Sequence, residues 1–173
     1  MRVSMDFMSY KQALQLCNDP RAGLAIISGE QLISLPPKYL DCIGQGVKEQ
    51  LDEMKGFYSE RLLGALIAYS NIKILGDKGI LLDDSPYIHL KIQADFIVFQ
   101  PRVGSRLRGC VNKTSKAHVG ILVHNFFNAS VAHDQDGHVE ETVSKDEDCE
   151  FTVTELFLHR NHLSLRGKNI QRL

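Results

Sequence analysis

The side chains best suited to chemistry in this chain are basic and aromatic, and most of them lie between residues 104 and 131. The segment GSRLRGCVNKTSKAHVGILVHNFFNASV places arginines, lysines and rings among alternating polar and apolar residues. Basic side chains bind phosphates with release of counterions, and an exposed ring stacked on a base contributes about 1–3 kcal/mol. The candidate set for contact with nucleic acid is Arg106, Arg108, Lys113, Lys116, His124, Phe126, Phe127, Arg166 and Lys168.

The two adjacent phenylalanines leave the aromatic part of this set open. At least one of Phe126 and Phe127 belongs in a hydrophobic core, because large apolar side chains are usually buried. For either ring, stacking on a base and burial in the core are therefore two open alternatives of about equal odds.

Other catalytic or ligand-binding patterns are not supported. The GxxxxG spacing from Gly104 is that of a phosphate-binding loop, but Cys110 and Val111 stand where Lys and Ser/Thr are needed. His159 and His162 lie in an expected turn without a carboxylate or thiolate at ligand spacing, and the four cysteines form no CxxC pair. We expect no catalytic residue, no metal and no cofactor, and a small hydrolase is the weakest alternative.

The charge of the C-terminal half is unevenly distributed. The chain has 173 residues and a net charge of −1, yet eight of the nine acids after residue 100 fall between residues 134 and 150, beside a single lysine. The rest of that half has nine basic residues and one acid, Glu155. We interpret this as a basic barrel whose charge is masked in the total by an acidic loop at residues 133–148.

The elements that must position these side chains fall into two halves. In the first half, segments with apolar residues at helical spacing are followed by segments in which apolar and polar residues alternate, as in a strand. Proline and glycine pairs separate these segments. The expected order is a helix at residues 5–17, a bent strand at 23–35 with a bulge at Gly29, a helix at 39–54, a strand at 62–75, turns at 76–79 and 83–86, and a strand at 87–99. This half therefore predicts strand, helix, strand, strand after a short first helix.

The second half predicts a small barrel. Residues 104–131 contain three short period-two strands interrupted by glycine, and residues 149–158 and 163–166 supply a fourth and a fifth strand around a turn at 159–162. Five short strands are typical of an OB barrel. No flexible linker precedes it, so we expect the two halves to pack rigidly.

The composition is that of a globular protein, with 43% hydrophobic and 24% charged residues. No stretch approaches the roughly 18 apolar residues of a membrane span. The N-terminal segment MRVSMDFMSYKQ has no apolar signal-peptide core. We expect no membrane contact.

Several segments resemble one family. VGILVHNFFNASV, preceded by RGCVNKTSKAH, is similar to the barrel of the RNA polymerase I stalk subunits, which are homologous to the stalk subunits of polymerases II and III and of the archaeal RNA polymerase. LPPKYL, AYSNIKILG, IHLKIQADFIVFQP and LRGKN also resemble that family. The similarity covers nearly the whole chain.

The resemblance implies an α+β fold with two domains. Residues 1–100 would be a truncated RNP-like tip domain of β-α-β-β order that docks on the polymerase core, and residues 101–173 a five-stranded OB-fold domain that meets RNA or a partner. The residues implied at the junction with the core are Leu75, Gly76, Asp77, Lys78 and Gly79.

The resemblance also implies a function. It predicts a non-catalytic subunit of RNA polymerase I in the nucleus and nucleolus, whose partners are the core subunits, the initiation factor for ribosomal RNA transcription and, weakly, nascent RNA. Whether a second small stalk subunit pairs with it is left open. The alternative is a stand-alone OB-fold RNA-binding module of translation or RNA decay, which would bind RNA tightly as an isolated chain.

Overall fold

The computed structural model describes residues 7–81, 84–132 and 143–173, with the side chains of residues 77 and 78 excepted. Two helices and a sheet precede a closed barrel. In chain order the elements are α1 (Tyr10–Leu16), the 3-10 helix η1 (Pro20–Ala22), β1 (Leu24–Leu35), the 3-10 helix η2 (Pro37–Tyr39), α2 (Ile43–Met54), β2 (Tyr58–Ser59), β3 (Gly64–Leu81), β4 (Ile88–Phe99), β5 (Arg106–Thr114), β6 (His118–Val123), β7 (Phe127–Ala132), β8 (Asp148–His159) and β9 (His162–Arg172).

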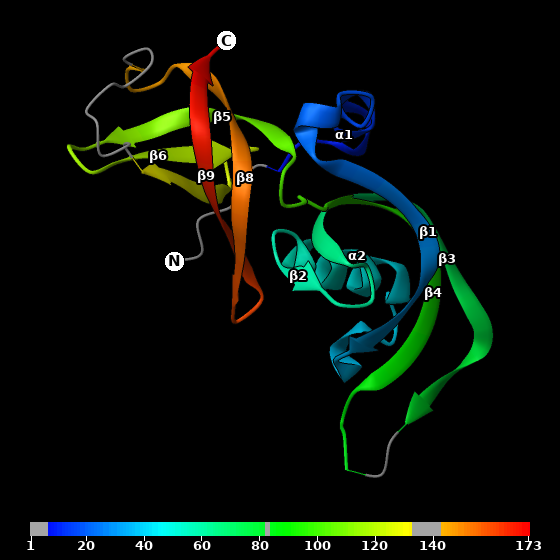
Figure 1. The fold of residues 1–173 in the computed structure, drawn as a ribbon. Coiled ribbons are helices and arrows are strands. Elements are labelled where there is room, and N and C mark those ends of the chain that lie inside the picture. Colours follow the sequence, from blue (N-terminus) through cyan, green and yellow to red (C-terminus); the bar gives the residue numbers. More distant parts are fainter. Residues whose placement is uncertain (1–6, 82–83, 133–142) are drawn as a thin grey trace.

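The N-terminal half is a curved antiparallel sheet of order β1-β4-β3-β2 that wraps around α2 (Figure 1). Val47 and Leu51 of α2 belong to one hydrophobic cluster with Ile92 and Phe96 of β4. Burial of the apolar face of α2 against the sheet stabilises this half. The predicted order of strand, helix, strand, strand is confirmed, and the structure adds the two-residue strand β2.

Both helices begin later than expected. Ser9 forms a capping box with Gln12, which fixes the start of α1, whereas residues 1–6 lie outside the described residues. Pro37 starts a 3-10 turn instead of α2. Tyr39 then packs so closely over α2 that a Cβ at Gly46 would lie 2.6 Å from a ring carbon of Tyr39.

Two features predicted from glycine are wrong. Residues 76–79 do not form a turn, because β3 continues to Leu81. The register of its pairing with β4 shifts between Leu75 and Ile80. Gly29 does not form a bulge, because β1 pairs with β4 in one unbroken register. A glycine inside a strand is compatible with a turn, a bulge or regular pairing, and the neighbouring strand decides among them.

The C-terminal half is a closed five-stranded barrel of order β5-β6-β7-β9-β8, as expected. Its inward side chains alternate along each strand, as Leu107 and Val111 do on β5. Gly167 on β9 is required by close packing, because a Cβ there would lie 2.4 Å from the ring of Phe151. The predicted strands are confirmed, although β9 extends to Arg172.

A second hydrophobic cluster, distinct from that around α2, joins the two halves. Ala13 of α1 and Ile97 and Phe99 of β4 belong to the same buried cluster as the interior of the barrel. The ring of Phe99 is fully buried and stacks on Phe127 of β7, with ring centroids 4.5 Å apart. The end of β4 is therefore buried on both sides, as its apolar sequence predicts, and the halves pack directly against each other.

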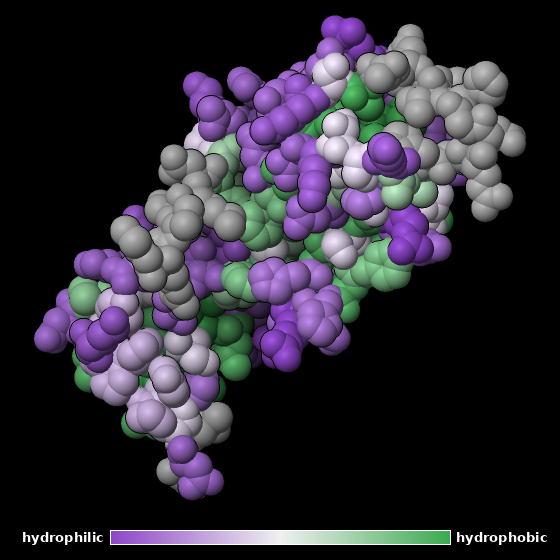
Figure 2. Space-filling model, turned by 90° about the vertical axis from the view of Figure 1, so that its left-hand side faces the viewer, coloured by the Kyte–Doolittle hydropathy of each residue, from purple (hydrophilic) through white to green (hydrophobic). Residues whose placement is uncertain are grey.

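The surface is mixed in character. Figure 2 shows hydrophilic side chains over much of one face, with smaller hydrophobic patches between them. Among the described residues, no helix is both long enough and apolar enough to cross a membrane.

Candidate functional site

The aromatic members of the candidate set lie at the seam between the two halves. Phe127 is 1% exposed and stacks on Phe99, so it has no face for a base, which corrects its place in the set. Phe126 is half-buried between Phe127 and Phe7, with ring centroids 5.0 and 5.1 Å away. These rings fill the seam because β7 begins where the barrel meets the sheet.

His124 also belongs to the seam. Its Nε2–H donates to the carbonyl oxygen of Ala22 at 2.7 Å, and its ring meets Phe99 edge-on at 5.2 Å. Burial lowers the pKa of His124, and the hydrogen bond to Ala22 opposes this shift only in part. His124 is thus a neutral link between the halves and not an exposed contact for RNA.

Each arginine of the candidate set is paired with a carboxylate of β8. Arg106 Nη1 lies 2.9 Å from Glu150 Oε1, and Arg108 Nη2 lies 2.7 Å from Asp148 Oδ2. The third pair joins Arg166 Nη1 and Glu155 Oε2 at 3.0 Å. The guanidinium of Arg166 also lies over the ring of Phe157, 5.1 Å from its centroid.

The strand order explains these pairs. In the barrel β8 lies between β5 and β9, so an acidic strand separates two basic ones. Thr152 of β8 pairs with Arg106 on one side and Lys168 on the other, which places these two basic residues in one row. Neighbouring strands lie about 4.8 Å apart, so this row spans two strand spacings, about 10 Å.

The interpretation of a basic barrel beside a separate acidic loop needs correction. Asp148 and Glu150 belong to β8, and both are paired with β5. Residues 133–142 of the predicted loop lie outside the described residues. The strand itself was predicted from residue 149. What sequence reasoning missed was that acidic residues alternate with apolar ones from Asp148 onward, which gives this strand an acidic outer face.

The lysines are placed differently from the arginines. Lys113 and Lys116 are exposed beyond the part of β5 that pairs with β8, so the structure does not gather them with Arg106 and Arg108. Lys168 is exposed on β9. Within the described ranges, none of these three lysines makes an ion pair.

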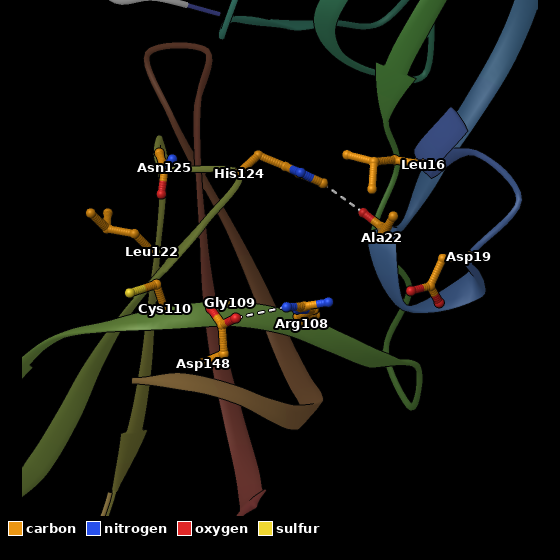
Figure 3. A pocket seen from close by; sticks show the side chains of 10 residues that line it. All are labelled: Leu16, Asp19, Ala22, Arg108, Gly109, Cys110, Leu122, His124, Asn125 and Asp148. Atoms are coloured by element: carbon orange, nitrogen blue, oxygen red, sulfur yellow. Dashed lines mark hydrogen bonds and ion pairs between the residues drawn. The ribbon is translucent and has the colours of Figure 1, made fainter. Parts of the chain in front are cut away.

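A cleft of about 330 Å³ lies where the N-terminal half meets β5 and β6 (Figure 3). Asp19 and Leu16 line one wall, and Arg108, Asp148 and the His124 ring line the other. The cleft carries little uncompensated charge, because its acidic and basic groups are already paired.

The wall at Asp19 is also linked electrostatically to the barrel. Hydrogen bonds from Arg21 hold the pKa of Asp19 below its usual range. Arg21 Nη1 lies 3.7 Å from Glu150 Oε2 as well, which connects η1 with β8.

The residues implied at the core junction lie in the distal part of β3, at the end of the sheet remote from the barrel (Figure 1). Leu75 pairs with Lys91 of β4, and Gly76 has a φ of 83°, which favours glycine. The backbone of Asp77 and Lys78 continues the strand.

Comparison with known proteins matches both halves to polymerase subunits. Residues 101–135 match the family described as "RPA43 OB domain in RNA Pol I", and residues 30–86 match the "SHS2 domain found in N terminus of Rpb7p/Rpc25p/MJ0397". The DNA-directed RNA polymerase I subunit RPA43 of Homo sapiens is 39% identical over 156 residues, which is 88% of this chain and 46% of the human protein. The chain belongs to the RPA43 family of RNA polymerase I subunits.

Other members of the RPA43 family show the same relationship. The Mus musculus subunit is 42% identical over 79% of this chain and 42% of its own length, and the Schizosaccharomyces pombe subunit is 34% identical over 49% of each. The chain spans less than half the length of these relatives. The RPA43 barrel model covers β5, β6 and β7, and the SHS2 model covers the candidate junction residues 75–79.

Proposed function

We propose that this chain acts as a non-catalytic stalk subunit of RNA polymerase I in ribosomal RNA synthesis. The sheet domain of residues 1–100 docks on the core enzyme, and the barrel of residues 101–173 contacts nascent RNA weakly and helps to recruit the initiation factor. Its proposed location is the nucleus and nucleolus. Membership of the RPA43 family supports the assignment to polymerase I.

The observation that carries this proposal is the core shared by the sheet and the barrel. Phe99 of the sheet and Phe127 of the barrel stack in one buried cluster, so we expect the two halves to move as one body. A rigid body with its docking segment at one end and its charged barrel at the other suits a projecting stalk. A stand-alone RNA-binding barrel has no need of the attached sheet.

Affinity purification of the tagged chain from nuclear extract tests the docking. We expect RNA polymerase I subunits to be recovered, identified by mass spectrometry. Lys78→Glu, in the candidate junction segment, should reduce this recovery about tenfold, because a reversed charge in a protein interface costs affinity. Lys48→Glu makes the same change on the exposed side of α2 and should have little effect.

Three results would contradict the proposal or part of it. Recovery of no polymerase subunit by the unmodified chain would exclude a stalk role, and recovery of ribosomal or RNA-decay proteins instead would favour the stand-alone RNA-binding module. Equal loss of binding in the two lysine variants would exclude residues 75–79 as the docking segment.

A further inference from the structure

We propose that β8 is an internal competitor for RNA on this barrel: its carboxylates occupy the arginines that would otherwise bind phosphates. This inference rests on the RNA contact in the proposed function and adds how that contact is weakened. The competing residues are Asp148, Glu150 and Glu155, and the arginines that they hold are Arg106, Arg108 and Arg166.

The position of β8 makes the competition systematic. All three carboxylates project from one strand that lies between the two strands carrying the arginines. Each carboxylate oxygen lies 2.7 to 3.0 Å from a guanidinium nitrogen, within the distance of a charge-assisted hydrogen bond. The carboxylates thus occupy donors that a phosphate oxygen would need.

The arginines nevertheless remain accessible to a ligand. The side chains of Arg106, Arg108 and Arg166 are each about half exposed, so a phosphate can approach them from solvent. Glu150 is different, because its side chain is only 12% exposed and is also approached by Arg21 from the N-terminal half. It is therefore the best-anchored competitor of the three.

Phosphate binding at this face is an exchange of partners. An arginine that binds RNA must leave its carboxylate, and the released carboxylate then repels the incoming phosphates. The expected result is weak, sequence-tolerant binding in which Lys168, exposed in the same row as Arg106, makes the direct contact. Neutralising a carboxylate removes the ion pair that must be broken and the repulsion of the incoming phosphates. It also frees one arginine.

The test is fluorescence anisotropy with a labelled oligouridylate of about 16 nucleotides, the upper end of the site of an OB barrel. Glu150→Gln should bind about three- to tenfold more tightly than the unmodified chain, and the slope of log K against log salt should steepen by about 0.7, the value for one added phosphate contact on a single strand. Glu30→Gln makes the same charge change at an exposed position of β1 and should alter the affinity for the oligouridylate by less than about twofold.

A double-mutant cycle separates competition from net charge. If only net charge matters, Arg106→Ala lowers log K by the same amount in the unmodified chain and in the Glu150→Gln variant. If Glu150 competes for Arg106, the loss is small in the unmodified chain and several-fold larger in the Glu150→Gln background. Circular dichroism of each variant shows that the fold is retained, and Asp148→Asn with Arg108→Ala repeats the cycle at a second pair.

The outcomes are distinct. A tighter Glu150→Gln variant with a non-additive cycle supports internal competition. RNA binding by the unmodified chain with unchanged affinity in the neutralised variants, or with additive cycles at both pairs, overturns it and leaves the proposed RNA contact intact. No binding by any variant overturns the RNA contact and this inference together, while the proposed docking to the polymerase core is judged by its own experiment.

Discussion

At the scale of single residues, His124 shows how one side chain joins the two halves. His124 and Asn125 both have left-handed backbone angles, with φ of 53° and 56°, at the start of the connection between β6 and β7. In this position the imidazole reaches the Ala22 carbonyl and the Phe99 ring. The imidazole is half-buried, and this desolvation favours its neutral form.

The lowered pKa of His124 predicts acid sensitivity. The unfolded chain binds a proton at this residue below about pH 6.5, whereas the folded chain does not until the pH reaches its lower pKa. The contribution of His124 to the free energy of unfolding should therefore be fully present above about pH 6.5. It should decrease as the pH falls below that value, by at most about 1.4 kcal/mol per pH unit. Urea denaturation at a series of pH values measures this slope.

Substitution of the histidine isolates its contribution. His124→Gln should flatten the slope, while His118→Gln, at an exposed histidine at the start of β6, should leave it unchanged. If His124 titrates by NMR at or above about pH 6.5, its burial does not control the acid response.

At the scale of elements, the β8–β9 hairpin reaches from the barrel to the N-terminal half. Arg160 and Asn161 at its tip have φ of 48° and 64°, which are the two left-handed residues of a type I′ turn. The carbonyl oxygen of Asn161 accepts a hydrogen bond from the Tyr58 N–H at 2.8 Å. The ring of Phe57 packs near His162, with centroids 4.9 Å apart. The turn conformation thus positions a contact with the N-terminal half.

Substitution at the turn tests this role. Asn161→Val should destabilise the protein by about 1–2 kcal/mol, because a β-branched residue is disfavoured in the left-handed region. Asn161→Gly should be neutral or stabilising, since glycine adopts this conformation without strain. The shift in the urea midpoint measures both effects. Equal midpoints for the two variants would show that the turn conformation does not limit stability.

At the scale of the whole molecule, the sheet and the barrel are joined by a shared buried cluster. The buried cluster runs from α1 and the end of β4 into the barrel interior. Glycine permits a second close contact at the seam, because a Cβ at Gly56 would lie 2.5 Å from the Phe126 ring. Neither half therefore buries its full apolar surface alone.

We expect one unfolding transition and a shared response to a mutation at the seam. Phe99→Ala removes a fully buried ring and should cost about 3–5 kcal/mol. Hydrogen exchange should report a loss of protection in both β1 and β6, because Phe99 pairs with Leu24 of β1 and belongs to the buried cluster that also contains Ile121 of β6. Phe99→Leu, a milder change, gives the same pattern at smaller amplitude if the alanine variant does not fold.

A control at the edge of the seam completes this test. Phe57 is 39% exposed, so Phe57→Ala should cost much less than Phe99→Ala. Two separate calorimetric transitions, with only the first half shifted by Phe99→Ala, would show that the halves unfold independently.

The fold was predictable where local pattern decides it. The alternation around Leu107 and Val111 predicted the barrel strands, because side chains of a strand face alternate sides. The apolar end of β4 predicted burial on both faces, which the structure confirms. Segment similarity predicted the family. Predictions failed at Gly29 and at residues 76–79, where pairing with β4 decides between a turn and a continuous strand.

The candidate site depended more on tertiary structure. The sequence determined that basic residues recur along the barrel strands and that acids are concentrated after residue 133. Only the closed barrel decided that β8 lies between β5 and β9, so that Glu150 faces Arg106 and Phe127 faces the sheet. Strand order and register arise from long-range pairing, and the charge order along a chain does not specify which opposite charges meet across a sheet.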